Sequence, residues 1–93
     1  MPAPHDLTAL LERGRAARAL LQDETFLSVL DDLSNYHIAA RVAALPGEGG
    51  REAREHHHLL HYALSEIAGD LSGRVQTADE IEARMRENED ADL

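Results

Sequence analysis

The chain has 93 residues and a formal net charge of −9, so charge alone is not expected to draw it to DNA or to an anionic membrane. It contains no cysteine, which excludes disulfides and thiolate metal sites. Aromatic residues are scarce while leucine and alanine are frequent, a composition that favours helices over sheet. No stretch has the length of a membrane span or the pattern of a signal peptide. We therefore expect one all-α domain over residues 1–93, soluble and made in the cytoplasm.

The first helix is predicted to begin near Asp6, since aspartate is favoured at helix N-caps, after an irregular arm at residues 1–5. Its apolar residues recur at helical spacing as far as Leu21. Gly14 and Ala17 lie on this apolar side, where their small size would let a neighbouring backbone approach. Gly14 lowers helix propensity by roughly 1 kcal/mol relative to alanine, and a packing role would account for its presence.

Two longer helices are predicted at residues 24–45 and 51–72, capped by Asp23 and Gly73, respectively. The short proline- and glycine-rich connection between them requires antiparallel packing. When residues whose numbers sum to 97 are paired, each residue of one apolar stripe meets one of the other. The six pairs are Phe26 with Leu71, Leu30 with Ile67, Leu33 with Leu64, His37 with Leu60, Ala40 with His57, and Ala44 with Ala53.

A short fourth helix is predicted from Ala78 to about Arg86, because Thr77 and Glu80 match a capping box. Residues 87–93 are rich in carboxylates and are expected to form a flexible acidic tail. The predicted architecture is an antiparallel helical hairpin at the core of a three- to four-helix bundle.

Three histidines are expected to meet in the hairpin. His57 and His61 have the i, i+4 spacing of two metal ligands on a helix, and His37 is positioned to be a third, as in three-histidine zinc sites. The segment lacks the glutamate of an H-E-x-x-H motif, so no catalytic residue and no cofactor is predicted. Alternatively, the histidines are neutral and hydrogen-bonded at the edge of the core. Burial and mutual repulsion would then lower their pKa values and weaken the fold at acid pH.

Apolar residues also occur outside the predicted stripes, which suggests a surface for a protein partner. We expect a homo-oligomer, with Tyr62 as the anchor of its interface. The predicted interface residues are Leu59, Tyr62, Leu27, Ile38 and Val42.

Three segments carry a resemblance to a known family. Residues 12–26 read ERGRAARALLQDETF, Asp32-Leu33 and Tyr36 follow in the next helix, and GREARE at residues 50–55 opens a leucine-rich helix. Together they resemble short helical proteins encoded near the head-morphogenesis and DNA-packaging genes of tailed bacteriophages and prophages. The resemblance covers residues 12–71, and the run His56-His57-His58 departs from it, since apolar or basic residues are expected there.

The resemblance implies a non-enzymatic structural or assembly protein of the virion or of head morphogenesis, made in a bacterial host. Its partners would be itself and other phage structural proteins, and no catalytic residue comes with the family. Two alternatives remain open. One is a DNA-packaging accessory similar to a small terminase subunit, binding DNA through the arginines of residues 13–18. The other is a metal-binding helical protein that uses the histidine cluster.

Overall fold

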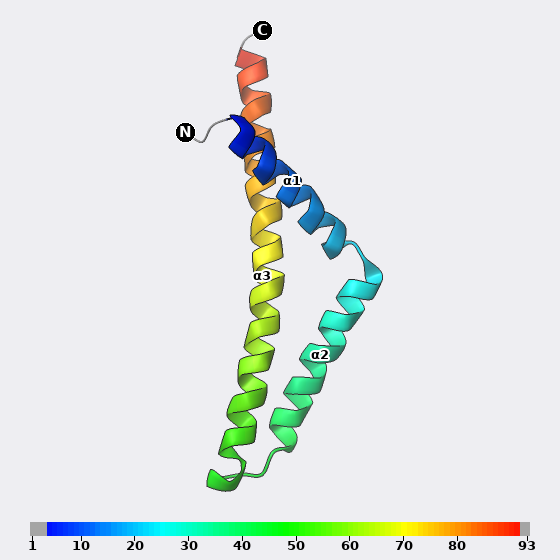
Figure 1. Cartoon of the computed structure of the whole chain (residues 1–93), viewed down its shortest axis with the longest axis vertical. Coiled ribbons are helices and arrows are strands. Elements are labelled where there is room, and N and C mark those ends of the chain that lie inside the picture. The colour runs from blue at the N-terminus through cyan, green and yellow to red at the C-terminus, as the bar shows by residue number, and fades with distance from the viewer. Residues whose placement is uncertain (1–3, 92–93) are drawn as a thin grey trace. The chain divides into compact units, whose positions relative to one another are not determined.

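The structure of the chain, a computed structural model, describes residues 4–91 and the side chains of residues 6–91. These residues form three α-helices and no strand: α1 (Pro4–Leu21), α2 (Glu24–Ala43) and α3 (Glu48–Ala91) (Figure 1). Both α1 and α2 pack against α3. The predicted all-α class is confirmed.

The long helix α3 takes part in two compact units. In one, α1 packs against the part of α3 that starts at Asp70; in the other, α2 packs against the part that ends at Gly69. The second unit is the predicted antiparallel hairpin, and its two helices run side by side in Figure 1.

Small residues bring α1 close to α3. Ala17 and Ala78 are 2% and 5% exposed and are the only buried hydrophobic residues in the described part of the chain. A Cβ atom on Gly14 would overlap the Cβ of Ala78 and lie 2.9 Å from the carbonyl oxygen of Arg74. The expectation that Gly14 and Ala17 permit a close backbone approach is confirmed.

The ends of the hairpin helices follow local rules. The carboxylate of Asp23 accepts a hydrogen bond from the backbone N–H of Phe26 at 2.8 Å, which confirms the predicted N-cap. α2 ends at Ala43, and Gly47, with φ of 74°, takes the left-handed conformation that the turn needs. The guanidinium of Arg54 donates to the carbonyl oxygens of Leu45 and Gly47 and so holds the turn against α3.

Contacts across the hairpin lie on either side of the predicted register. The contact of His37 with His57 joins residues whose numbers sum to 94, and that of Arg41 with His58 joins residues that sum to 99. These two contacts therefore place the helices within about one turn of the register predicted from the apolar stripes.

The predicted seam on α3 is wrong in part. Leu60 and Ile67 are 37% and 48% exposed, as is Leu33 on α2 at 42%. Within the hairpin, the half-buried residues of α3 instead follow alternating steps of three and four. They are Arg54, His57, His61, Leu64 and Ala68. The predicted and observed stripes share His57 and Leu64, so periodicity alone does not decide how the helix is rotated about its axis.

The predicted fourth helix is also corrected, because α3 continues without a break to Ala91. Gly73 does not end the helix: the only positive φ in the described backbone belongs to Gly47. Beyond Gly73, Val75 and Ala78 continue the buried side of α3, and the packing against α1 outweighs the roughly 1 kcal/mol that a helical glycine costs. The capping-box pattern of Thr77 and Glu80 therefore lies within a helix.

The two ends of the chain differ from expectation as well. α1 begins at Pro4, a residue type suited to the first turn of a helix, and not at Asp6. Residues 87–91 of the predicted flexible tail belong to α3. Residues 1–3 of the predicted arm and residues 92–93 of the tail lie outside the described residues.

Neither unit encloses a large apolar side chain. Among the described residues no large side chain is fully buried, and α2 has no buried residue at all. In that part of the chain, no helix combines the length and hydropathy needed to cross a membrane.

Candidate functional site

The histidine pair at the centre of the hairpin joins α2 to α3. The Nδ1 atoms of His37 and His57 are 2.9 Å apart, and the ring centroids are 5.2 Å apart. A hydrogen bond between two imidazole nitrogens requires an N–H on one ring and a lone pair on the other. At least one of the two rings must therefore be neutral for this contact to exist.

Two further rings lie beside the histidine pair, those of Tyr36 and His56. The ring of Tyr36 lies edge-on to His37 and His57, with centroids at 5.1 and 6.1 Å. His56 lies edge-on to His57 at 5.1 Å. Partial burial lowers the pKa of His37 below its usual 6.5, and repulsion from His57, His56 and His61 lowers this pKa further.

His58, the residue after His57 on α3, also contacts α2. A guanidinium nitrogen of Arg41 lies 3.2 Å from its Nδ1 atom, so the guanidinium donates to the imidazole. This bond joins α2 to α3 a second time, one turn from the histidine pair.

The predicted metal ligands do not assemble as a set of three. His37 and His57 are in contact, and His61 is half-buried one turn further along α3. Yet among the described side chains, no group of three or more histidine, aspartate or glutamate residues is placed to hold a metal ion. The structure thus brings two of the three together, through a hydrogen bond between their rings.

The five predicted interface residues are all exposed. Val42 is 81% exposed, Leu59 64% and Tyr62 56%, with Ile38 and Leu27 at 45% and 40%. The hydroxyl of Tyr62 is hydrogen-bonded to Glu66, which raises the pKa of the tyrosine. These exposures are compatible with an interface, but no described contact identifies a partner, and the interface stays a prediction.

A second exposed apolar surface escaped the sequence reasoning, which assigned part of it to the hairpin seam. Its residues follow helical steps of four and three on α2 and of three and four on α3. We call it the uncharged face; it consists of Val29, Leu33, Tyr36, Leu60, Ala63 and Ile67. The sequence signal that could have revealed it is a second apolar stripe on each helix, displaced by one residue from the stripe that faces the other helix.

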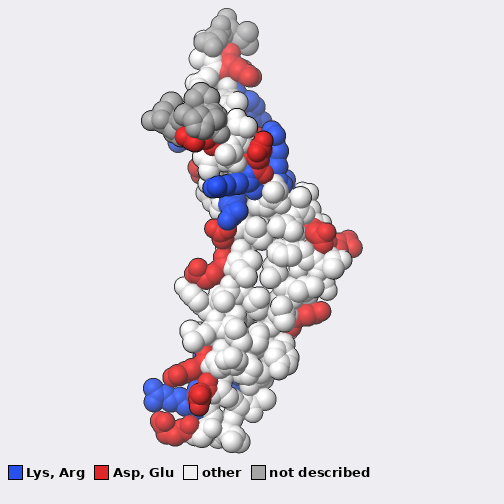
Figure 2. Space-filling view, in the orientation of Figure 1, with Lys and Arg blue, Asp and Glu red and all other residues white. Residues whose placement is uncertain are grey.

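The two halves of the uncharged face lie on one side of the hairpin. Tyr36 contacts His57 across the seam, and Leu60 lies one turn beyond His57 on α3. Helical positions place Val29 and Leu33 on the Tyr36 side of α2, and Ala63 and Ile67 on the Leu60 side of α3. Figure 2 shows a broad surface without charge over the hairpin, with carboxylates at its margins.

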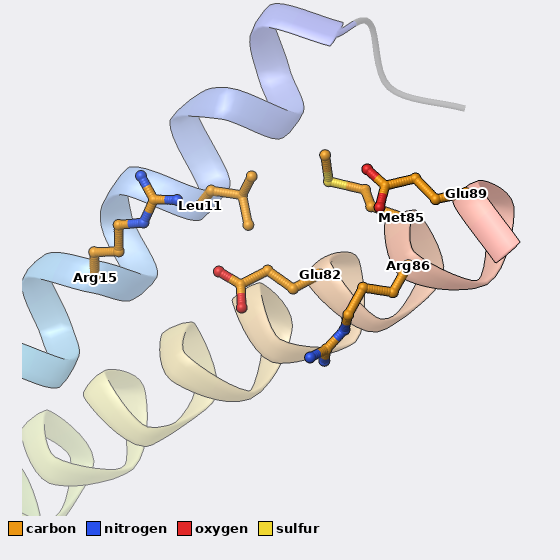
Figure 3. Close-up of a pocket in the computed structure, with 6 residues that line it drawn as sticks. All are labelled: Leu11, Arg15, Glu82, Met85, Arg86 and Glu89. Atoms are coloured by element: carbon orange, nitrogen blue, oxygen red, sulfur yellow. The ribbon is translucent and has the colours of Figure 1, made fainter.

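Arg15 and Arg18 of α1 lie near carboxylates of α3. Arg18 forms an ion pair with Asp79 at 2.6 Å. Arg15 lines an open pocket of about 310 Å³ in which Leu11, Glu82 and Met85 point toward one another (Figure 3). Arg86 and Glu89 complete its lining. These contacts partly neutralise the positive charge that the sequence suggested for DNA binding.

The fold and these surfaces define an all-α protein of three packed helices with a paired-histidine contact and a large exposed apolar surface. No protein-family model, curated protein or solved structure matches the chain.

Proposed function

We propose that this chain is a non-enzymatic structural or assembly protein of a tailed phage or prophage. It acts by packing its helix faces against other proteins, in the virion or during head morphogenesis. The phage part of the proposal rests on the resemblance of residues 12–71 to small helical proteins encoded near head and packaging genes.

The observation that carries the proposal is the number of large apolar side chains left uncovered in the hairpin. Thirteen large apolar residues of the described chain are exposed, and all but Leu20 and Met85 belong to the hairpin unit. Monomeric soluble proteins rarely expose large contiguous apolar patches, and those that persist commonly bind other proteins. A protein whose apolar residues face outward in this way is suited to assembly.

The native mass of the purified chain tests the proposal, measured alone and after mixing with each product of the genes adjacent to its own. We expect a defined complex with at least one of these proteins, in addition to any association of the chain with itself. Substituting the exposed apolar residues of the hairpin with glutamate should lower the mass while circular dichroism keeps its helical form. A chain that binds none of these proteins contradicts the proposal.

The first alternative is a DNA-packaging accessory that contacts phosphates through Arg13, Arg15 and Arg18. Its support is the exposure of all three side chains on α1. Three phosphate contacts would give a salt dependence with a slope of about −2.7 in a log–log plot of affinity against salt. Binding to duplex DNA with that slope, abolished by replacing the three arginines with alanine, favours this alternative. No binding favours the assembly protein.

The second alternative is a metal-binding helical protein, for which the contact of His37 with His57 is the supporting observation. Elemental analysis of protein purified without an affinity tag decides it. One bound metal ion per chain, lost in His37→Ala and His57→Ala, favours this alternative; a metal content equal to that of the buffer rejects it.

A further inference from the structure

We propose that a second copy of this chain packs on the uncharged face, so that two hairpins cover each other in a four-helix arrangement. The inference rests on the proposed function, of which it names the first partner and the face that receives it. It differs from the interface predicted from the sequence, which uses other residues of the same two helices.

The hairpin does not bury its own apolar side chains. The hairpin consists of two helices, and none of its described apolar side chains is buried. Two helices alone do not enclose a core, and short helices in water depend on tertiary packing for their stability. Leu33, Leu60 and Ile67 flank the seam and are only partly covered by it. A helix pair laid over them would complete a core that each hairpin begins.

The apolar stripes of α2 and α3 that form the uncharged face lie next to each other. Val29, Leu33 and Tyr36 occupy the middle of α2, and Leu60, Ala63 and Ile67 occupy the stretch of α3 that the register places beside them. The two stripes therefore lie at the same level of the hairpin and form one continuous patch. A patch of two parallel apolar stripes is the shape that another antiparallel helix pair presents in return.

The absence of charge on the uncharged face favours a second copy of this chain over other partners. In a two-fold contact the same surface of both copies is buried, so any charge on this surface faces like charges of the other copy. With a net charge of −9, this chain can meet itself most easily where no carboxylate lies. None of the six residues of the uncharged face is charged, and the neighbouring carboxylates of Asp32 and Glu66 lie at its margins.

The same absence of carboxylates disfavours a basic partner. A protein or nucleic-acid-binding partner attracted by the overall negative charge would be expected to dock where acidic residues gather. On the hairpin these lie at the margins of the white surface in Figure 2 and not within it. A self-complementary apolar contact fits the centre of this surface better.

The area of the hairpin face is close to that of a small dimer interface. The 20 residues of α2 make a helix about 30 Å long, and two adjacent helices are about 20 Å wide, so the hairpin offers a footprint of roughly 600 Å². Dimer interfaces usually bury about 800 Å² per partner, with weaker ones near 600 Å². A second copy must therefore cover the whole hairpin face, with the six residues of the uncharged face at its centre.

Sedimentation of the full chain over a range of concentrations tests the inference. We expect the wild type to sediment with twice the mass of the 10.3 kDa chain at high micromolar concentration. The double substitution L33E/I67E should weaken self-association by about 100-fold or more, because it sets carboxylates against each other at the centre of the contact. The matched control L27E/I38E replaces two exposed residues of the interface predicted from the sequence, which lie on the opposite side of α2, and should leave self-association unchanged.

A second measurement decides the matter if L33E/I67E loses its helices. The chain has no cysteine, so a single cysteine can report on one surface position. Ala63 lies on the uncharged face and Ser65 on the opposite side of α3, and both are exposed. In the dimer, the thiol of A63C should react with a maleimide about tenfold or more slowly than that of S65C, since the partner covers it.

Each outcome is decisive. A wild-type chain that stays monomeric, equal reaction rates for A63C and S65C, or dissociation by L27E/I38E and not by L33E/I67E overturns the inference. A dimer that binds none of the proteins encoded beside it keeps the inference and counts against the proposed assembly function. A monomer that binds one of these proteins overturns the inference and supports the proposed assembly function.

Discussion

The Nδ1 atoms of His37 and His57 lie 2.9 Å apart and join α2 to α3 through a single hydrogen bond between two titratable rings. When both rings are protonated, each nitrogen carries a proton and neither can accept. The contact that links the two helices therefore exists only while at least one ring is neutral. This makes the hairpin sensitive to pH in a range where few other side chains titrate.

We predict that the chain becomes less stable as the pH falls below about 6.5. The pKa of His37 is lowered from 6.5 in the folded chain, by partial burial and then by repulsion from His57, His56 and His61. Below 6.5 the unfolded chain binds a proton that the folded chain resists, so the free energy of unfolding decreases until the lowered pKa is reached. Above 6.5 this contribution to stability is fully present.

Urea unfolding at a fixed protein concentration, between about pH 8 and about pH 5, measures the effect. H37Q should flatten the decrease, because it removes the titrating ring. N35Q is the control, since Asn35 lies on the exposed side of α2 and does not titrate; it should keep the wild-type slope. Equal slopes for wild type and H37Q would show that another group controls the acid response.

We predict that Gly14→Ala destabilises the packing of α1 on α3 by about 1–3 kcal/mol, less the gain of up to about 1 kcal/mol in helix propensity. The added Cβ would overlap Ala78 and press on the backbone oxygen of Arg74, so the helices must separate. Thermal unfolding measures the loss. Gly69→Ala serves as control, because nothing lies within 4 Å of a Cβ at that position; a loss of stability there would point to a general effect of the added methyl group.

Gly73→Ala should stabilise the chain by about 0.5–1 kcal/mol. The residue lies inside α3 with a helical φ, and a Cβ there meets nothing within 4 Å. The sign of the change is informative, because alanine would be destabilising at a left-handed helix cap. Gly47→Ala provides that comparison: Gly47 has φ of 74°, and the substitution should cost about 1–2 kcal/mol. A destabilising Gly73→Ala would mean that α3 ends near Ser72.

Asp23→Ala should reduce stability by about 0.5–2 kcal/mol, since its carboxylate satisfies the free backbone N–H of Phe26 at the start of α2. Asp31→Ala is the control of equal charge. Its contact with Asn35, at 3.4 Å on the exposed side of α2, is weak, and its loss should change stability by no more than about 0.5 kcal/mol. Chemical denaturation of the three proteins compares the two effects; equal losses would assign the effect to charge and not to capping.

Several features could be predicted from the sequence because they depend on short-range chemistry. Asp23 caps α2 through a bond to a residue three positions away, and glycine at residue 47 permits a turn that other residues resist. Gly14 disfavours its own helix, and this local cost indicated the close contact with α3 that the structure contains. That His37 lies within about one turn of His57 could be predicted from the spacing of two stripes across a short connection, although the predicted register paired His37 with Leu60.

The rotation of α3 about its axis was decided only by the tertiary structure. Steps of three and four residues describe two neighbouring stripes, one with Leu60 and Ile67 and the other with His61 and Ala68, and both contain His57 and Leu64. The choice depends on which side chains α2 offers across the seam, a non-local property that helical periodicity does not encode. The observed rotation leaves Leu60 and Ile67 exposed and so creates the uncharged face.

The continuity of α3 was likewise settled beyond the local sequence. Gly73 and the Thr77–Glu80 pattern both favour a break, and each contributes about 1 kcal/mol. The close packing of Gly14 of α1 on Ala78 and on the backbone of Arg74 lies beyond Gly73 and outweighs these local preferences. Local capping and turn chemistry thus determined where α2 begins and where the hairpin turns, while burial between distant segments decided that α3 continues past Gly73 and which of its faces stays uncovered.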